Sequence, residues 1–183
     1  MSDAVPFFEA WRLGRSAIVV GRAVPAATAM AALAFDVLPL PDAAPQTAMP
    51  ATFLCVVFFW TIYRPDLLGP VLILILASLL DAIAGLPLGL SALAFLAVRT
   101  AAMPRERNFA STSFVIVWAS FVLAAMAVLG LRWAIACLWF AHWFDLQPVA
   151  VELALTVASY PPIAYMLTKL RPLVAKVPHV SGS

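Results

Sequence analysis

The sequence predicts an all-α membrane protein, a bundle of six transmembrane helices with both termini in the cytoplasm. Three observations support this fold class. The 183 residues are 64% hydrophobic and only 11% charged, whereas a soluble domain is about half apolar and about a quarter charged. Apolar segments recur along the chain, several of them near the roughly 20 residues that a membrane-crossing helix needs. Basic residues gather beside alternate connections between these segments, as they do in short cytoplasmic loops.

The chain length allows one domain that lies mostly in lipid. We divide it into a cytoplasmic or interfacial arm (residues 1–16), a six-helix bundle (residues 17–171) and a cytoplasmic tail (residues 172–183). The net charge of +2 is too small to indicate a nucleic-acid partner. Cys55 and Cys137 both lie in apolar runs, where a free cysteine behaves as a small hydrophobic residue.

The first predicted span covers about residues 17–38. Arg22 lies near its start, where the long side chain can reach the lipid headgroups. A cleavable signal sequence is the alternative, because the Ala-Leu-Ala at residues 32–34 resembles a peptidase site. The apolar character continues past that site, which favours a retained helix. The proline-rich connection that follows, residues 36–50, cannot continue a helix.

The next three predicted spans are shorter. They cover about residues 51–62, 67–84 and 88–103. Gly85 and Gly89 have the spacing of a helix-dimerisation motif, but Pro87 between them favours a turn. We therefore expect a helical hairpin within residues 63–107, with the other helices packed around it.

Two further spans complete the predicted bundle. They cover about residues 111–131 and 149–167. Between them, Arg132 precedes a tryptophan-rich segment (residues 133–144) that could extend the fifth span or form a separate helix on the outer leaflet. The aromatic density favours the separate helix. Pro161 and Pro162 remove two hydrogen-bond donors from the last span and should kink and break it.

The basic residues predict the orientation. All eleven Lys and Arg residues except Arg132 lie beside the two terminal segments and two of the connections. The remaining connections carry carboxylates at Asp36, Asp42, Asp145 and Glu152. Because loops rich in Lys and Arg stay in the cytoplasm, both termini should be cytoplasmic.

Asp81 is the most informative ionisable residue. It lies about 14 residues into the third span, roughly 21 Å along a helix, at a depth where an unpaired carboxylate costs a few kcal/mol. Arg132 and Glu152 should lie at a similar height, so we expect an intramembrane charge cluster with Asp81. The alternative is that Asp81 accepts hydrogen bonds from backbone groups in the turn at residues 85–89. Arg99 should extend its side chain to the headgroups.

No set of residues suited to catalysis, or to binding a metal or a cofactor, stands out in the sequence. It has no pair of intramembrane carboxylates, no His and Cys residues at ligand spacing and no phosphate-binding glycine loop. We therefore expect no catalytic residues, no metal and no cofactor. From its residues alone the chain is a small helical membrane protein that binds something.

One stretch carries a more specific pattern. Arg64 and Pro65 open it, Asp81 and Gly85 lie in an L-x-D-x-x-x-G sequence at the end of an apolar helix, and Gly89 closes a P-L-G turn. In this combination the chain resembles the MreD family of rod shape-determining proteins. The specific part of the resemblance is short, but the predicted topology agrees with the family over most of the chain.

The resemblance implies a non-catalytic subunit of the bacterial cell-elongation machinery in the inner membrane. Such a protein would bind the periplasmic scaffold MreC through MreC's membrane helix, and could also self-associate. It would act with the actin-like MreB, the glycosyltransferase RodA and its penicillin-binding transpeptidase in lateral peptidoglycan synthesis. The family's bundle is also similar to the substrate-binding subunits of energy-coupling-factor transporters. That similarity supplies the alternative function, binding of a small vitamin-type molecule.

Overall fold

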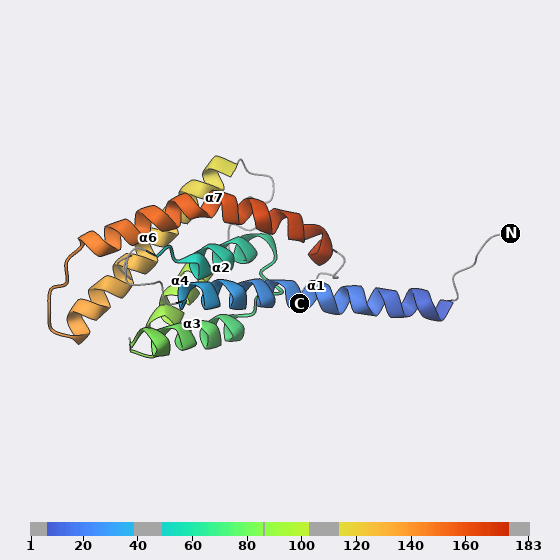
Figure 1. The fold of residues 1–183 in the computed structure, drawn as a ribbon, viewed down its shortest axis with the longest axis horizontal. Coiled ribbons are helices and arrows are strands. Elements are labelled where there is room, and N and C mark those ends of the chain that lie inside the picture. The colour runs from blue at the N-terminus through green and yellow to red at the C-terminus, as the bar shows by residue number, and fades with distance from the viewer. Residues whose placement is uncertain (1–6, 39–48, 86, 103–113, 176–183) are drawn as a thin grey trace.

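The computed structural model describes residues 7–38, 49–85, 87–102 and 114–175. This part of the chain contains six α-helices and no strand, which confirms the predicted all-helical class (Figure 1). The helices are α1 (Phe7–Asp36), α2 (Thr52–Tyr63), α3 (Pro70–Ala84), α4 (Leu90–Ala102), α6 (Phe114–Trp139) and α7 (Gln147–Ala175). Two of them, α6 and α7, are long and apolar enough to cross a membrane. That all six helices cross it stays a prediction.

The helices extend into both predicted end segments. The helix α1 begins at Phe7, within the predicted arm of residues 1–16, and α7 ends at Ala175, within the predicted tail of residues 172–183. The division into arm, bundle and tail stays a prediction. The chain ends lie outside the described residues, so their cytoplasmic placement stays a prediction.

The helix α2 lies at the centre of the bundle. Every residue from Thr52 to Ile62 is buried, and α1, α4, α6 and α7 all pack against it. With 12 residues, α2 is about 18 Å long, much shorter than the roughly 30 Å hydrocarbon core. Its neighbours cover its whole circumference, which explains why a short and uniformly apolar helix is stable here. The element around which the others pack is therefore α2 and not the predicted hairpin of residues 63–107.

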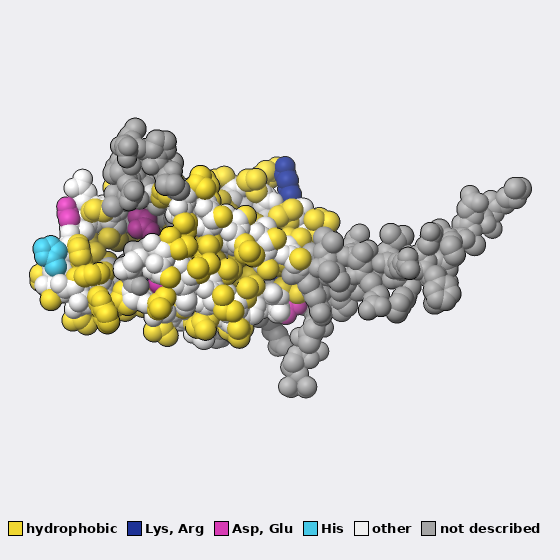
Figure 2. All heavy atoms as spheres, turned by 60° about the horizontal axis from the view of Figure 1, so that its bottom comes forward, with side chains coloured by type: hydrophobic (Ala, Val, Ile, Leu, Met, Phe, Trp, Pro, Cys, Tyr) yellow, Lys and Arg dark blue, Asp and Glu magenta, His cyan; other side chains and the backbone are white. Residues whose placement is uncertain are grey.

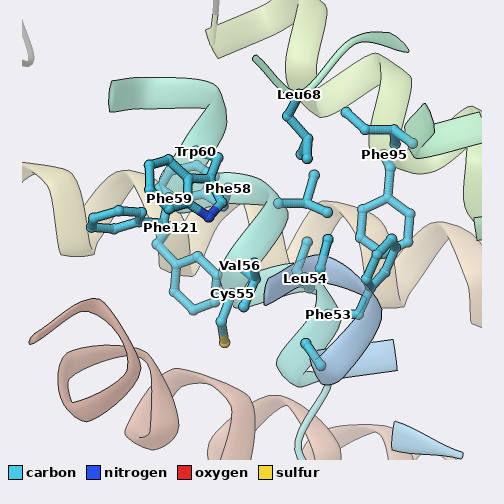
Figure 3. Close-up of a cluster of buried hydrophobic side chains, with 14 of the residues drawn as sticks. Phe53, Leu54, Cys55, Val56, Phe58, Phe59, Trp60, Leu68, Phe95 and Phe121 are labelled. Carbon is cyan, nitrogen blue, oxygen red and sulfur yellow. The ribbon is translucent and has the colours of Figure 1, made fainter. Parts of the chain in front are cut away.

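Aromatic side chains fasten α2 to its neighbours. Figure 3 shows them leaving α2 in several directions. Phe53 contacts Phe95 of α4 edge to face, with ring centroids 5.2 Å apart. Phe58 contacts Phe121 of α6 at 5.2 Å and Tyr160 of α7 at 5.9 Å. Pairs of this geometry contribute about 0.5–1.5 kcal/mol each beyond the burial of their surface.

A tight turn joins α3 to α4 where the sequence predicts one. Gly85 ends α3 with a left-handed φ of 67°, and Gly89 precedes α4 with a φ of 92°. A residue with a Cβ atom rarely adopts these angles. The two glycines therefore serve the turn through their backbone conformation.

The helix α6 does not stop at Arg132 but continues to Trp139. The predicted separate helix at residues 133–144 is therefore wrong, and the extension that the sequence also allowed is what forms. No Pro or Gly lies between Arg132 and Trp139, so nothing removes a hydrogen bond from the helix there. The chain turns just after α6, at Ala141, which adopts a positive φ of 48°.

The last span is not broken at Pro161 and Pro162, and a kink at these prolines stays a prediction. The helix α7 runs without interruption from Gln147 to Ala175, through Pro161 and Pro162. Figure 1 shows it as one helix that arches over the bundle. Tyr160, directly before the prolines, is buried and stacks on Phe121 with centroids 4.1 Å apart. This packing holds α7 against α6 at the position where two backbone donors are missing.

The outside of the bundle is largely hydrophobic. Figure 2 shows a face covered mostly by hydrophobic side chains, with few charged ones. On α6 and α7, large side chains such as Leu123 and Met166 are 66% and 69% exposed. Continuous apolar surface of this kind marks contact with lipid or with another protein.

Candidate functional site

Asp81 links the end of α3 to the start of α4. The residue is fully buried, and its Oδ2 accepts a hydrogen bond from the backbone N–H of Ser91 at 2.9 Å. Ser91 is the second residue of α4, and the first N–H groups of a helix have no partner within it. A carboxylate in this position also interacts favourably with the positive end of the helix dipole. The contact corresponds to the alternative role for Asp81, hydrogen bonding at the turn.

The expected three-residue charge cluster is only partly assembled. Arg132 of α6 pairs with Glu152 of α7, with 3.7 Å between Nη1 and Oε1. Within the described chain no ion pair joins Asp81 to Arg132, because the Asp81 carboxylate is directed to the start of α4. The charge of Asp36 also acts on Arg132 and Glu152.

Asp36 accepts hydrogen bonds from the start of α2, as Asp81 does from the start of α4. It is the last residue of α1, and its two carboxylate oxygens accept hydrogen bonds from the backbone N–H groups of Thr52 and Phe53, both at 2.9 Å. The hydroxyl of Thr52 donates to the same carboxylate. From the sequence, Asp36 is predicted only to lie in a connection, and this role is not apparent. No local spacing could have revealed it, since the partners are separated by the proline-rich segment.

Arg64 fastens the other end of α2. It follows the last residue of that helix and is 8% exposed. Its guanidinium forms a bidentate pair with Asp66, at 3.0 and 3.1 Å. A further N–H, on Nη1, donates to the backbone oxygen of Val174 at 3.0 Å. Arg64 therefore holds the connection between α2 and α3 against the end of α7.

Arg99 does not extend to the headgroups as expected. It is 5% exposed, and its guanidinium donates to the backbone oxygens of Leu68 at 2.7 Å and Pro65 at 2.9 Å. Arg99 thus binds the connection between α2 and α3 from α4. Together with Arg64, it holds that connection from two sides.

A row of small residues lies on the outward face of α7. Ala150, Ala154 and Ala158 are all exposed and are spaced four residues apart. We call these three residues the alanine face. Elsewhere on its surface, α7 packs against α1, α2 and α6. Small residues at this spacing let the backbone of a second helix approach closely within lipid.

A groove opens beside the second half of α7, where α2, α6 and α7 meet. Its volume is about 310 Å³. The lining is aromatic and aliphatic with few polar groups, and consists of Phe59, Tyr63, Phe114, Val117, Tyr160, Pro161, Ala164, Tyr165 and Thr168. Two of the lining rings form cation–π contacts. The Arg171 guanidinium lies 4.4 Å from the Tyr63 ring centroid, and the Lys169 Nζ lies 4.8 Å from that of Tyr165.

The described residues offer surfaces for packing and binding. Among them, no three His, Cys, Asp or Glu side chains come close enough to hold a metal ion. Two of the outward-facing surfaces are the alanine face, which lies on α7, and the groove, which lies beside α7.

Comparison with known proteins gives one match. The family model described as rod shape-determining protein MreD matches residues 20–170. Searches of curated proteins and of solved structures returned no match. The matched range contains the buried carboxylate caps, the arginine-held connection, the alanine face and the groove lining.

Proposed function

Since the chain belongs to the MreD family of rod shape-determining membrane proteins, we propose that it is a non-catalytic, multi-pass subunit of the bacterial cell-elongation complex in the inner membrane. It binds the membrane helix of the scaffold protein MreC. Through MreC it supports lateral peptidoglycan synthesis by RodA and its penicillin-binding transpeptidase, in coordination with MreB.

The observation that supports MreC binding is the alanine face of α7. Helices in lipid associate through close packing and not through the hydrophobic effect, so interfaces favour small residues. Ala150, Ala154 and Ala158 give an exposed surface without bulky side chains along about two turns of helix. Contacts of α7 with α1, α2 and α6 hold this surface in place, so little conformational freedom would be lost on binding.

The test is copurification of MreC with variants of the full chain. Ala154→Phe places a ring in the middle of the alanine face, and we expect the amount of bound MreC to fall by about tenfold, or about 1.4 kcal/mol. Folding should be unaffected, because Ala154 is exposed. The matched control is Ala82→Phe, a change at an exposed alanine of α3. Undiminished MreC binding by Ala154→Phe would remove α7 as the contact surface.

Two further results bear on the function as a whole. Depletion of the protein from a rod-shaped host should give rounded cells, and cells that kept their rod shape would contradict a role in elongation. A vitamin that copurified at one molecule per chain would instead favour the alternative, a substrate-binding transporter subunit. A vitamin site needs several polar groups that converge on the ligand, whereas the groove offers mostly aromatic and aliphatic side chains.

A further inference from the structure

We propose that the groove between α2, α6 and α7 is a binding site for one anionic phospholipid. An acyl chain lies along the groove, and the headgroup phosphate binds at Lys169 and Arg171. The site is separate from the alanine face and does not depend on the proposed binding of MreC. It gives the bundle a preference for lipid charge that its apolar surface alone would not have.

The groove has the shape and chemistry of an acyl-chain site. Its volume of about 310 Å³ lies at the lower end of the usual range for sites that bind small molecules, about 300–1,000 Å³. On α7 its lining extends from Tyr160 to Thr168, about 12 Å along the helix. Phe114 and Tyr165 line it and are more than half exposed, at 52% and 65%. The groove is thus apolar and open to the outside of the bundle, where lipid tails lie.

Two cations lie at the end of this apolar groove. Lys169 directly follows Thr168, the last lining residue of α7, and Arg171 comes two residues later. Each cation lies over a tyrosine ring that lines the groove. Among the residues that the structure describes, neither cation pairs with a carboxylate. Arg64, the neighbouring buried cation, is held by Asp66 and Val174. The described lining residues carry no charged side chain, so among them and their neighbours the free positive charge lies at the mouth of the groove.

The tyrosine contacts fix the cations without neutralising them. A cation–π contact attracts the charge to the ring face and requires none of the N–H donors. The N–H groups of Lys169 and Arg171 can then bind phosphate oxygens, which Arg recognises in bidentate geometry. Exposed cations that only reach toward bulk headgroups would not need to be held over the rings of a groove.

The predicted orientation agrees with this ligand. The basic residues after the last span should lie at the cytoplasmic leaflet, which carries anionic lipid. Basic pockets between membrane helices on that side bind anionic headgroups. Each Lys or Arg near the surface contributes about 1 kcal/mol, which corresponds to an affinity about fivefold higher. Two cations therefore predict a preference of at least tenfold, roughly, over a neutral lipid.

Native mass spectrometry of the purified full chain tests the proposal. Phosphatidylglycerol and phosphatidylcholine with the same acyl chains are added in turn, and bound lipid is counted. We expect one phosphatidylglycerol per chain, with a preference of about tenfold over phosphatidylcholine. The double variant Lys169→Gln with Arg171→Gln should bind both lipids equally. Thr168→Phe, which fills the mouth of the groove and keeps both charges, should weaken both lipids.

Further measurements distinguish a specific lipid site from a general effect of charge. Lys176→Gln removes one charge from the predicted tail and should leave the lipid preference unchanged, whereas Lys169→Gln removes one charge at the groove and should lower it. An equal loss of preference in these two single variants would mean that only net charge matters and would overturn the site. Inorganic phosphate at the same concentration should not displace the lipid, since it lacks the acyl chain. Equal binding of the two lipids by the unmodified chain, or loss of the lipid when MreC is bound, would also overturn it. Circular dichroism verifies that each variant is folded.

Discussion

Asp81 and Ser91 join α3 to α4 through one buried hydrogen bond, 2.9 Å from carboxylate oxygen to backbone nitrogen. Asp36 makes the same kind of contact with Thr52 at the start of α2. The helices α2 and α4 are too short to span the hydrocarbon core by themselves. In each, a backbone N–H group at the start of the helix donates to a carboxylate of the preceding helix. A helix start within an apolar bundle has no water to satisfy its free N–H groups, and each carboxylate takes that place.

Loss of the Asp81 side chain should destabilise the protein. We expect Asp81→Ala to lower the free energy of unfolding by about 1–3 kcal/mol, because it removes a helix cap and leaves a buried N–H without a partner. Asp81→Asn retains an acceptor oxygen and should cost less than about 1 kcal/mol. Unfolding in detergent, followed by circular dichroism, measures both values. Equal losses for the two variants would show that the charge of Asp81, and not its cap, is what stabilises the fold.

A charge exchange separates the cap from the cluster that the sequence suggested. Asp81→Arg should be strongly destabilising, and adding Arg132→Asp should not restore stability, because the two residues serve separate contacts. The effects of such independent changes add. Restored stability in the double variant would establish a direct pairing between Asp81 and Arg132.

Arg99 should not be replaceable by lysine. Arg99→Ala removes two charge-assisted hydrogen bonds to the connection between α2 and α3, and we expect a loss of about 2–4 kcal/mol. Arg99→Lys keeps the charge but cannot reach both backbone oxygens with a planar fork, so we expect an intermediate loss. A side chain that only reached for the headgroups would tolerate lysine fully. Thermal unfolding of the three proteins distinguishes these outcomes.

The stacked rings of Tyr160 and Phe121 should stabilise the folded protein. Tyr160→Ala opens a cavity between α6 and α7, and we expect a loss of about 2–4 kcal/mol. Tyr160→Phe keeps the ring at 4.1 Å from Phe121 and should be nearly neutral. A double-mutant cycle with Phe121→Ala should give a coupling of about 0.5–1.5 kcal/mol. A coupling near zero would mean that the two rings contribute only through their separate burial.

The local features of this fold could be predicted from the sequence. The helices follow from long apolar segments, and the turn at Gly85 and Gly89 follows from glycine, the residue type that most readily adopts a positive φ. The Arg-Pro, Asp and Gly pattern was sufficient to indicate the family that the match over residues 20–170 supports. Each of these features depends on residues that are close together in the chain.

Features that depend on distant residues were decided by the tertiary structure. The sequence gives no sign that α2 is the central helix, because a short apolar segment looks the same whether lipid or protein surrounds it. Asp36 meets Thr52 across the proline-rich connection, and Arg99 meets Leu68 and Pro65 from another helix. Side-chain contacts of this kind leave no periodic pattern in the sequence, since the packing of the helices determines which groups face each other. The sequence by itself determined the helices and the turn between two of them. Only the packing of the helices decided which carboxylate accepts hydrogen bonds from the start of which helix.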